Sequence, residues 1–231
     1  MQSLGFSNLI ISNSVFNPDV VSYTTSLMKD YGFKRFFCAV SHDVCFTSPQ
    51  IHIAKKKNIE EKIKKSAPRD TSLYVATNVL MTRDSVYEKQ ISRLSNIKTQ
   101  YLFVEFPIFD GKDWIDSTLN YLLYKQKKNP VFISFEKNIA TYDHDFILHL
   151  ISTRCSAFMV DLNAFTNPKM IPYIEAMIDA NAIIIPGMSG VVENYTSLSE
   201  KLNFFRENVG PLKYAKMVVN SNKSTKIVFG I

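Results

Sequence analysis

Short apolar runs alternate with longer amphipathic stretches along the whole chain. The apolar runs are rich in β-branched and aromatic residues and predict strands; they lie at 8–12, 36–40, 73–81, 101–106, 130–135, 157–162 and 182–186, with a shorter eighth run at 217–219. The stretches between them have helical periodicity and predict helices at 20–31, 50–65, 84–94, 113–127, 143–153, 168–181 and 197–207. This alternation is the pattern of a repeated βα unit.

The apolar runs also indicate how the strands are covered. FFCAV at 36–40 and AIIIP at 182–186 are apolar at nearly every position, which is typical of a parallel sheet buried on both faces by helices. In the predicted helix 113–127, Trp114, Ile115 and Leu119 recur at helical spacing, so we expect this stripe, with its tryptophan, to face the core.

Seven or eight βα units predict an α/β fold, a distorted TIM-like (β/α) barrel that is closed or nearly closed. An open doubly wound sheet is the alternative. However, no Gly-x-Gly-x-x-Gly loop follows the first predicted strand and the chain has no P-loop motif, so a nucleotide site has no support.

The composition of the chain also predicts the number of domains and the cellular compartment. The chain has 231 residues, 46% hydrophobic and 21% charged, and no Pro-, Gly- or Ser-rich linker divides it, which favours a single folded domain over residues 1–231. Its three cysteines are scattered, without a C-x-x-C pair, which suits a reducing compartment. With no apolar run long enough for a transmembrane segment and no signal-like N-terminus, we expect a cytoplasmic protein.

The net charge is +6, and lysines cluster at 55–65 and 125–128. Such clusters attract phosphate or an anionic membrane. Because Glu60 and Glu61 lie at helical spacing from Lys64 and Lys65, a solvated helix face is the simpler interpretation of the first cluster. No Arg-rich, aromatic-interleaved pattern accompanies the lysines, so we expect no nucleic-acid partner.

Functional residues of a βα barrel lie at the carboxyl ends of its strands. The candidates are therefore the polar residues that end or follow each apolar run: Ser12, Asn13, Ser14, Ser41, His42, Asp43, Thr77, Asn78, Glu105, Ser134, Glu136, Lys137, Asp161, Asn163, Gly187 and Ser189. Of the four histidines only His42 belongs to this set, because His52, His144 and His149 fall on predicted helices or their margins.

This set is poor in metal ligands. His42 with the carboxylates of Asp43, Glu105, Glu136 and Asp161 could bind one metal ion, but internal hydrogen bonds and ion pairs are the favoured role of these groups. PGMSG at 186–190 lacks the flanks of a Gly-x-Ser-x-Gly nucleophile elbow, and no Cys–Arg phosphate loop is present. Glu105, followed by Phe106 and Pro107, is a candidate general base if it is buried.

Three segments resemble a known family. YLFVEFPIFD at 101–110, NPVFISFEKN at 129–138 and FMVDLNAFT at 158–166 are similar to motifs of the manganese-dependent protein-tyrosine phosphatases of bacterial capsule and exopolysaccharide operons, which belong to the PHP (polymerase and histidinol phosphatase) superfamily. NLIISNSVFNPD at 8–19 occupies the place of the family's first metal motif, and DYGFKRFFCAVSHD at 30–43 resembles the segment that follows. The resemblance spans nearly the whole chain.

The resemblance implies a distorted barrel in which up to three metal ions activate a water for attack on phosphotyrosine. By position, His42 matches a histidine ligand, Glu105 the glutamate of Glu-Phe-Pro, and Glu136 the glutamate of His-Pro-Glu-Arg. The remaining family positions carry other residues here: Ile10, Ser12 and Ser14 for Asp-x-His-x-His, Asn78 for a glutamate, Ser134 and Lys137 for the histidine and arginine of His-Pro-Glu-Arg, and Pro186, Gly187, Met188 and Ser189 for Ser-Asp-Ala-His. Serine, isoleucine and glycine do not replace imidazole or carboxylate as strong metal ligands, so the activated water would be missing.

Two functions follow from the resemblance. The first is a degenerate tyrosine-phosphatase-like protein of a capsular or exopolysaccharide biosynthesis system, a non-catalytic binding or regulatory protein without a cofactor. Its partner would be a phosphotyrosine-containing capsule-assembly kinase or another protein, with phosphate bound by Lys137, Ser134 and Ser12. The alternative is an active metal-dependent phosphatase, with manganese held by His42, Glu105 and Asp161 and with Glu105 and His42 as its catalytic residues. A third possibility is a lipid-surface or polysaccharide contact through the 55–65 face.

Overall fold

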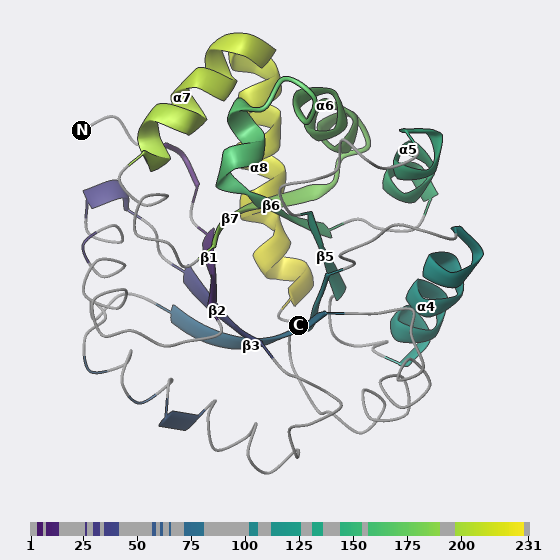
Figure 1. Ribbon diagram of the computed structural model, residues 1–231. Coiled ribbons are helices and arrows are strands. Elements are labelled where there is room, and N and C mark those ends of the chain that lie inside the picture. The colour runs from purple at the N-terminus through teal and green to yellow at the C-terminus, as the bar shows by residue number, and fades with distance from the viewer. Residues whose placement is uncertain are drawn as a thin grey trace.

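The fold is an α/β barrel with helices outside a parallel sheet (Figure 1). The computed structural model describes residues 4–6, 8–13, 26, 30–32, 35–41, 57–58, 61, 65, 72–80, 102–105, 112–125, 131–135, 144–153, 157–189 and 197–228. These residues include seven strands and several helices of the second half of the chain, and they confirm the predicted α/β class.

The strands are β1 (Asn8–Asn13), β2 (Arg35–Ser41), β3 (Ser72–Leu80), β4 (Leu102–Glu105), β5 (Val131–Phe135), β6 (Ala157–Asp161) and β7 (Ile183–Ser189). Each pairs in parallel with the next along the chain, and β1 also pairs with β7, so the sheet closes on itself. All five residues of β6 are buried, as expected for a strand covered on both faces.

The helices are α4 (Lys112–Lys125), α5 (His144–Thr153), α6 (Ile171–Asp179), α7 (Leu198–Val209) and α8 (Pro211–Val228), and a 3-10 helix, η2 (Leu162–Thr166), follows β6 directly. The apolar stripe predicted for α4 is confirmed at Ile115 and Leu119, which are fully buried, whereas Trp114 is only partly buried. Ile147, Leu150 and Ile151 form the corresponding stripe of α5.

One predicted strand is wrong. Met217, Val218 and Val219 lie inside α8, not in an eighth strand. Tyr214, Met217 and Ser221 are buried at spacings of three and four residues, whereas Val219 is 48% exposed. The burial period is therefore that of a helix, and a run of three apolar residues is too short for its period to be read from sequence.

The predicted helices of the first half lie mostly outside the described residues. Within 20–31, Ser26, Asp30 and Tyr31 are helical, and the whole of 84–94 lies outside. Within 50–65, Lys57, Glu61 and Lys65 are helical and exposed. Their spacing of four residues matches the solvated helix face predicted for the lysine cluster.

Helix α8 crosses the amino-terminal end of the barrel. Its Ser221 hydroxyl donates to the carbonyl of Ile184 near the start of β7, and its Ser221 carbonyl accepts from Asn8 Nδ2 at the start of β1 at 2.8 Å. Tyr214 donates to the carbonyl of Leu4 at 3.0 Å. This helix therefore covers the amino end at the point where the first and last strands pair, while the carboxyl end lies on the opposite side of the barrel.

None of the helices in the described part of the chain is long and apolar enough to cross a membrane.

Candidate functional site

The strand register brings several predicted site residues to one face of the sheet. Paired residues of parallel strands share a face, and residues two apart on one strand share it too. Glu105 pairs with Ser134, and Ser134 pairs with Met159, which is two residues before Asp161. Asp161 pairs with Gly187, and Ser189, two residues further along β7, pairs with Ser12.

Ser12, Glu105, Ser134, Asp161 and Ser189 therefore occupy positions of the same face near the carboxyl ends of their strands. Three of the five carry hydroxyl groups and two carry carboxylates. Glu105 and Asp161 are separated by β5 and offset by two residues along the strands, so their backbones lie roughly 12 Å apart. By register these positions lie on one face near the carboxyl ends of the strands, and their residues are rich in hydroxyl groups.

Gly187 shows what occupies the space next to Asp161. A Cβ atom at Gly187 would lie 2.6 Å from Met159 Cγ and 3.1 Å from Met159 Sδ. Met159 is buried, with 5% of its surface exposed. A larger side chain at position 187 would therefore have to displace the methionine.

Asp161 is buried at the end of β6 and shapes the segment that follows. One of its carboxylate oxygens, Oδ1, accepts a hydrogen bond from the backbone N–H of Asn163 at 2.8 Å and caps η2. A carboxylate at this position satisfies a backbone donor that the helix leaves without an intrahelical partner. Asp161 therefore fixes the position of Asn163.

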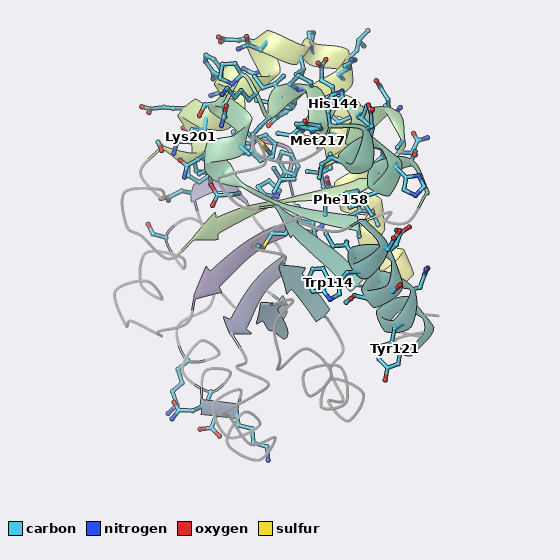
Figure 2. The ribbon with its side chains drawn as sticks, turned by 45° about the vertical axis from the view of Figure 1, so that its right-hand side comes forward. Trp114, Tyr121, His144, Phe158, Lys201 and Met217 are labelled. Atoms are coloured by element: carbon cyan, nitrogen blue, oxygen red, sulfur yellow. The ribbon has the colours of Figure 1, made fainter. Side chains whose placement is uncertain are left out.

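Asn163 in turn holds a lysine. Its Oδ1 accepts a hydrogen bond from Nζ of Lys201, which lies in the first turn of α7. Both residues are partly buried. Because Asn163 belongs to η2, which directly follows β6, this contact lies at the carboxyl end of the barrel; in Figure 2 Lys201 lies on the side toward which the arrow of β7 points.

An aromatic contact fixes α7 against η2. Phe165 of η2 and Phe205 of α7 are fully buried, and their rings meet edge to face with centroids 5.1 Å apart and planes at 82°. Such pairs add to the free energy gained from burial of the rings. Lys201 is consequently presented by a helix whose position is set by the core.

The predicted site residues differ in how far the structure places them. Asp161 is placed with its side chain, whereas Ser12, Glu105 and Ser134 are placed by strand register. His42, Glu136 and Lys137 lie outside the described residues. His144 and His149 lie on α5, as predicted; His144 Nδ1 is 2.9 Å from the Tyr173 hydroxyl, and His149 Nε2 is 3.9 Å from Asp116 Oδ2.

Sequence reasoning missed Lys201. It lies within a predicted amphipathic helix, and nothing in SLSEKLNFF at 197–205 distinguishes it from a lysine on a solvated face. Its role depends on Asn163, which is 38 positions earlier in the chain.

Among the described residues, the surroundings of Gly187 do not fit the carboxylate metal ligand that the resemblance implies at this position. Near Asp161, the space that a carboxylate at position 187 would enter is filled by the Met159 side chain, and a thioether is a poor ligand for manganese. Asp161 itself is engaged in capping η2. Among the residues with described side chains, no group of three or more His, Cys, Asp or Glu is arranged to bind a metal ion.

Comparison with solved structures shows the fold. One similar structure comes from a study of YwqE from Bacillus subtilis and CpsB from Streptococcus pneumoniae, described as unique metal-dependent tyrosine phosphatases. Its TM-score is 0.63 at 10% identity, over 91% of this chain and 87% of the other.

Two further structures extend the comparison. A phospho-2-dehydro-3-deoxyheptonate aldolase from Thermotoga maritima has a TM-score of 0.53 at 12% identity, over 90% of this chain and 70% of that one. A dihydrodipicolinate synthase has a TM-score of 0.52 at 10% identity, over 97% and 83%. No protein-family model matches the chain, and no curated protein sequence is similar to it. At these identities the likeness establishes a barrel fold shared with several enzyme classes.

Proposed function

We propose that this chain is a PHP-type, tyrosine-phosphatase-like protein that binds a phosphorylated tyrosine side chain without hydrolysing it. Its place would be a bacterial capsular or exopolysaccharide biosynthesis system, as a cytoplasmic binding or regulatory protein. The partner would be a phosphotyrosine-containing protein such as a capsule-assembly kinase.

The observation that carries the proposal is the contact between Met159 and Gly187. In the family that the sequence resembles, an aspartate corresponds to position 187, and here a buried thioether fills the space that its side chain would enter. A metal-bound water is a nucleophile at neutral pH only where the ion is held. Loss of that position removes hydrolysis and leaves the rest of the barrel intact.

The hydroxyl-rich edge supports binding of a phosphoryl group. Ser12 and Ser134 share one face near the carboxyl ends of β1 and β5, in the proposed phosphate site with Lys137. Hydroxyl and ammonium groups donate hydrogen bonds to phosphate oxygens, and those to charged oxygens are the stronger ones. The similarity to the tyrosine phosphatase structures in fold and length agrees with this choice of ligand.

Binding of a phosphotyrosine peptide tests the proposal. A fluorescent peptide with several phosphotyrosines is titrated with the protein, and the same peptide with unmodified tyrosines is the matched control. We expect saturable binding of the phosphorylated form only, weakened by Ser134→Ala and by Lys137→Met. Equal affinity for both peptides, or no binding of either, would contradict the proposal.

A second measurement separates binding from hydrolysis. The protein is equilibrated with manganese, freed of unbound ion, and assayed for metal content and for phosphate release from the same peptide. We expect no turnover above a buffer blank. Near-stoichiometric manganese together with turnover that His42→Ala abolishes would establish the active phosphatase with His42, Glu105 and Asp161 as ligands, and would overturn the non-catalytic assignment.

A further inference from the structure

Lys201 differs from an ordinary surface lysine in how its ammonium group is held. Its Nζ donates to the neutral amide oxygen of Asn163, whose own position is fixed by the hydrogen bond from its backbone N–H to the buried Asp161. The helix that carries Lys201 is fixed by the contact of Phe205 with Phe165. The ammonium is thus positioned from two directions.

The charge of Lys201 is not neutralised by this arrangement. No carboxylate with a described side chain lies within 4.0 Å of its Nζ. An ammonium group has three N–H donors, and the amide oxygen takes one of them. A partly buried cation with two remaining donors is an attractive site for an anion, because the ion pair is screened less than it would be in open solvent.

We propose that Lys201 is an anion-binding residue at the carboxyl end of the barrel and donates to an oxygen of the phosphoryl group, with Asn163 as its positioning residue. The inference rests on the proposed function for the identity of the ligand, a phosphorylated tyrosine side chain. The site residues predicted from sequence all lie on strands or directly after them, and this inference adds Lys201, a cation on α7. The bond formed is a charge-assisted hydrogen bond, and no covalent step is involved.

Substitutions at two positions test the site, with one matched control. Lys201→Met removes the ammonium and keeps an unbranched side chain. Asn163→Asp keeps Lys201 but supplies a carboxylate that pairs with it. Lys169→Met is the control, because Lys169 is an exposed lysine in the turn that follows η2 and removing it changes the net charge equally.

The affinity of each variant is measured with two probes, inorganic phosphate and the phosphotyrosine peptide. We expect Lys201→Met and Asn163→Asp to weaken binding of both probes by about 10- to 100-fold, the usual effect of losing a hydrogen bond to a charged group. Lys169→Met should change either affinity less than twofold. Circular dichroism and the thermal midpoint show whether each variant is folded. If Lys201→Met does not fold, the affinities of Asn163→Asp alone test the role of Lys201.

The two probes distinguish this inference from the proposed function. If the wild type binds the peptide and both variants bind it equally well, Lys201 is not the anion-binding residue while the proposed function stands. If the wild type binds inorganic phosphate through Lys201 but does not prefer the phosphorylated peptide, the site stands and the proposed function fails. If the wild type binds neither probe, both are overturned.

Discussion

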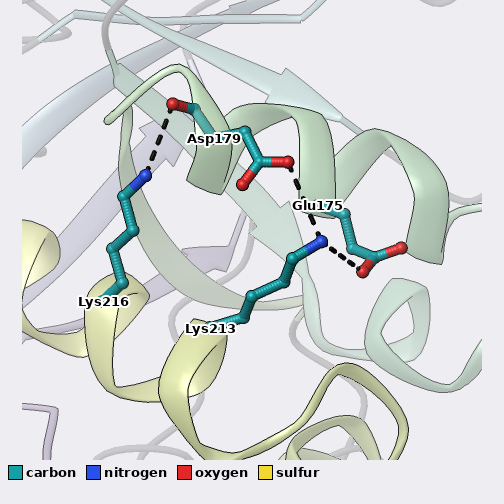
Figure 3. A network of polar contacts seen from close by, with 4 residues as sticks. All are labelled: Glu175, Asp179, Lys213 and Lys216. Carbon is teal, nitrogen blue, oxygen red and sulfur yellow. Dashed lines mark hydrogen bonds and ion pairs between the residues drawn. The ribbon is translucent and has the colours of Figure 1, made fainter.

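The two ends of the barrel differ in the partners of their lysines. At the amino end, Lys213 of α8 pairs with Glu175 of α6 at 2.8 Å and lies 3.8 Å from Asp179, as Figure 3 shows. Its hydrogen bond with Glu175 is the main cause of a raised pKa of the Lys213 ammonium. At the carboxyl end, Lys201 contacts the neutral amide of Asn163. One lysine is paired with carboxylates within the fold, whereas the other contacts an uncharged amide oxygen.

Several polar side chains of the amino end also bond to groups within the molecule. Asn8 and Tyr214 donate to backbone carbonyls at 2.8 and 3.0 Å, and Asn222 Nδ2 donates to the carbonyl of Gly5 at 2.8 Å. Each of these bonds joins residues more than 200 positions apart. The bonds of Asn8 and Tyr214 are buried, and the three bonds together tie the last helix to β1 and to the residues that precede it. The described contacts of the amino end therefore maintain the fold, whereas the proposed binding site lies at the carboxyl end.

The largest expected effect comes from breaking the contact that holds α7 over the carboxyl end. Phe205→Ala should lower the free energy of unfolding by about 3–5 kcal/mol, because it removes a fully buried ring and leaves a cavity. Phe204→Ala, at the neighbouring position that is 43% exposed, is the matched control. Urea unfolding of both variants measures the difference, and equal destabilisation would contradict the placement of α7.

A smaller effect is expected from filling the space between β6 and β7. Gly187→Ala should destabilise the protein by about 1–3 kcal/mol, because the new methyl group meets the Met159 side chain. In a Met159→Ala background the same change should cost less. The double-mutant cycle from urea unfolding gives the coupling free energy, and additive effects would show that Met159 does not occupy this space.

The raised pKa of Tyr214, at the amino end, predicts that the stability of the protein depends on pH. Burial is the main cause that raises the pKa of its hydroxyl from 10.0 to about 12, and the charge of Arg206 opposes this. Because the folded-state pKa is the higher one, the contribution to stability is fully present below pH 10 and is lost as pH rises toward 12.

Unfolding in urea between pH 8 and 11.5 checks this dependence. The wild type should lose more stability over that range than Tyr214→Phe, which lacks the titrating group. Taking the difference between the two proteins removes the contribution of the other tyrosines and the lysines. Parallel curves would mean that Tyr214 is not buried in the folded state.

Much of the fold was predictable from sequence because its signals are local. The seven strands and the helices α4 to α7 follow from apolar periodicity within short windows. Helix α8 was not predicted. Met217 to Val219 form a short apolar run that was predicted as a strand, and only the burial of Tyr214, Met217 and Ser221 shows the helical period. Strand-end positions such as Glu105, Ser134 and Asp161 were predictable from the βα alternation. Lys201 was not, because its partner Asn163 is distant in the chain and is positioned by a cap that only the folded structure contains.

The smallest effect is expected at Lys213, and it separates the two lysines most directly. Lys213→Met should lower the thermal midpoint by no more than about 2 °C, since exposed ion pairs contribute little and are screened by salt. It should leave binding of inorganic phosphate unchanged, whereas Lys201→Met should abolish most of that binding with little loss of stability. If Lys213→Met instead weakens phosphate binding as strongly, the anion is attracted by overall charge. The two ends of the barrel would then not differ in the way their hydrogen bonds suggest.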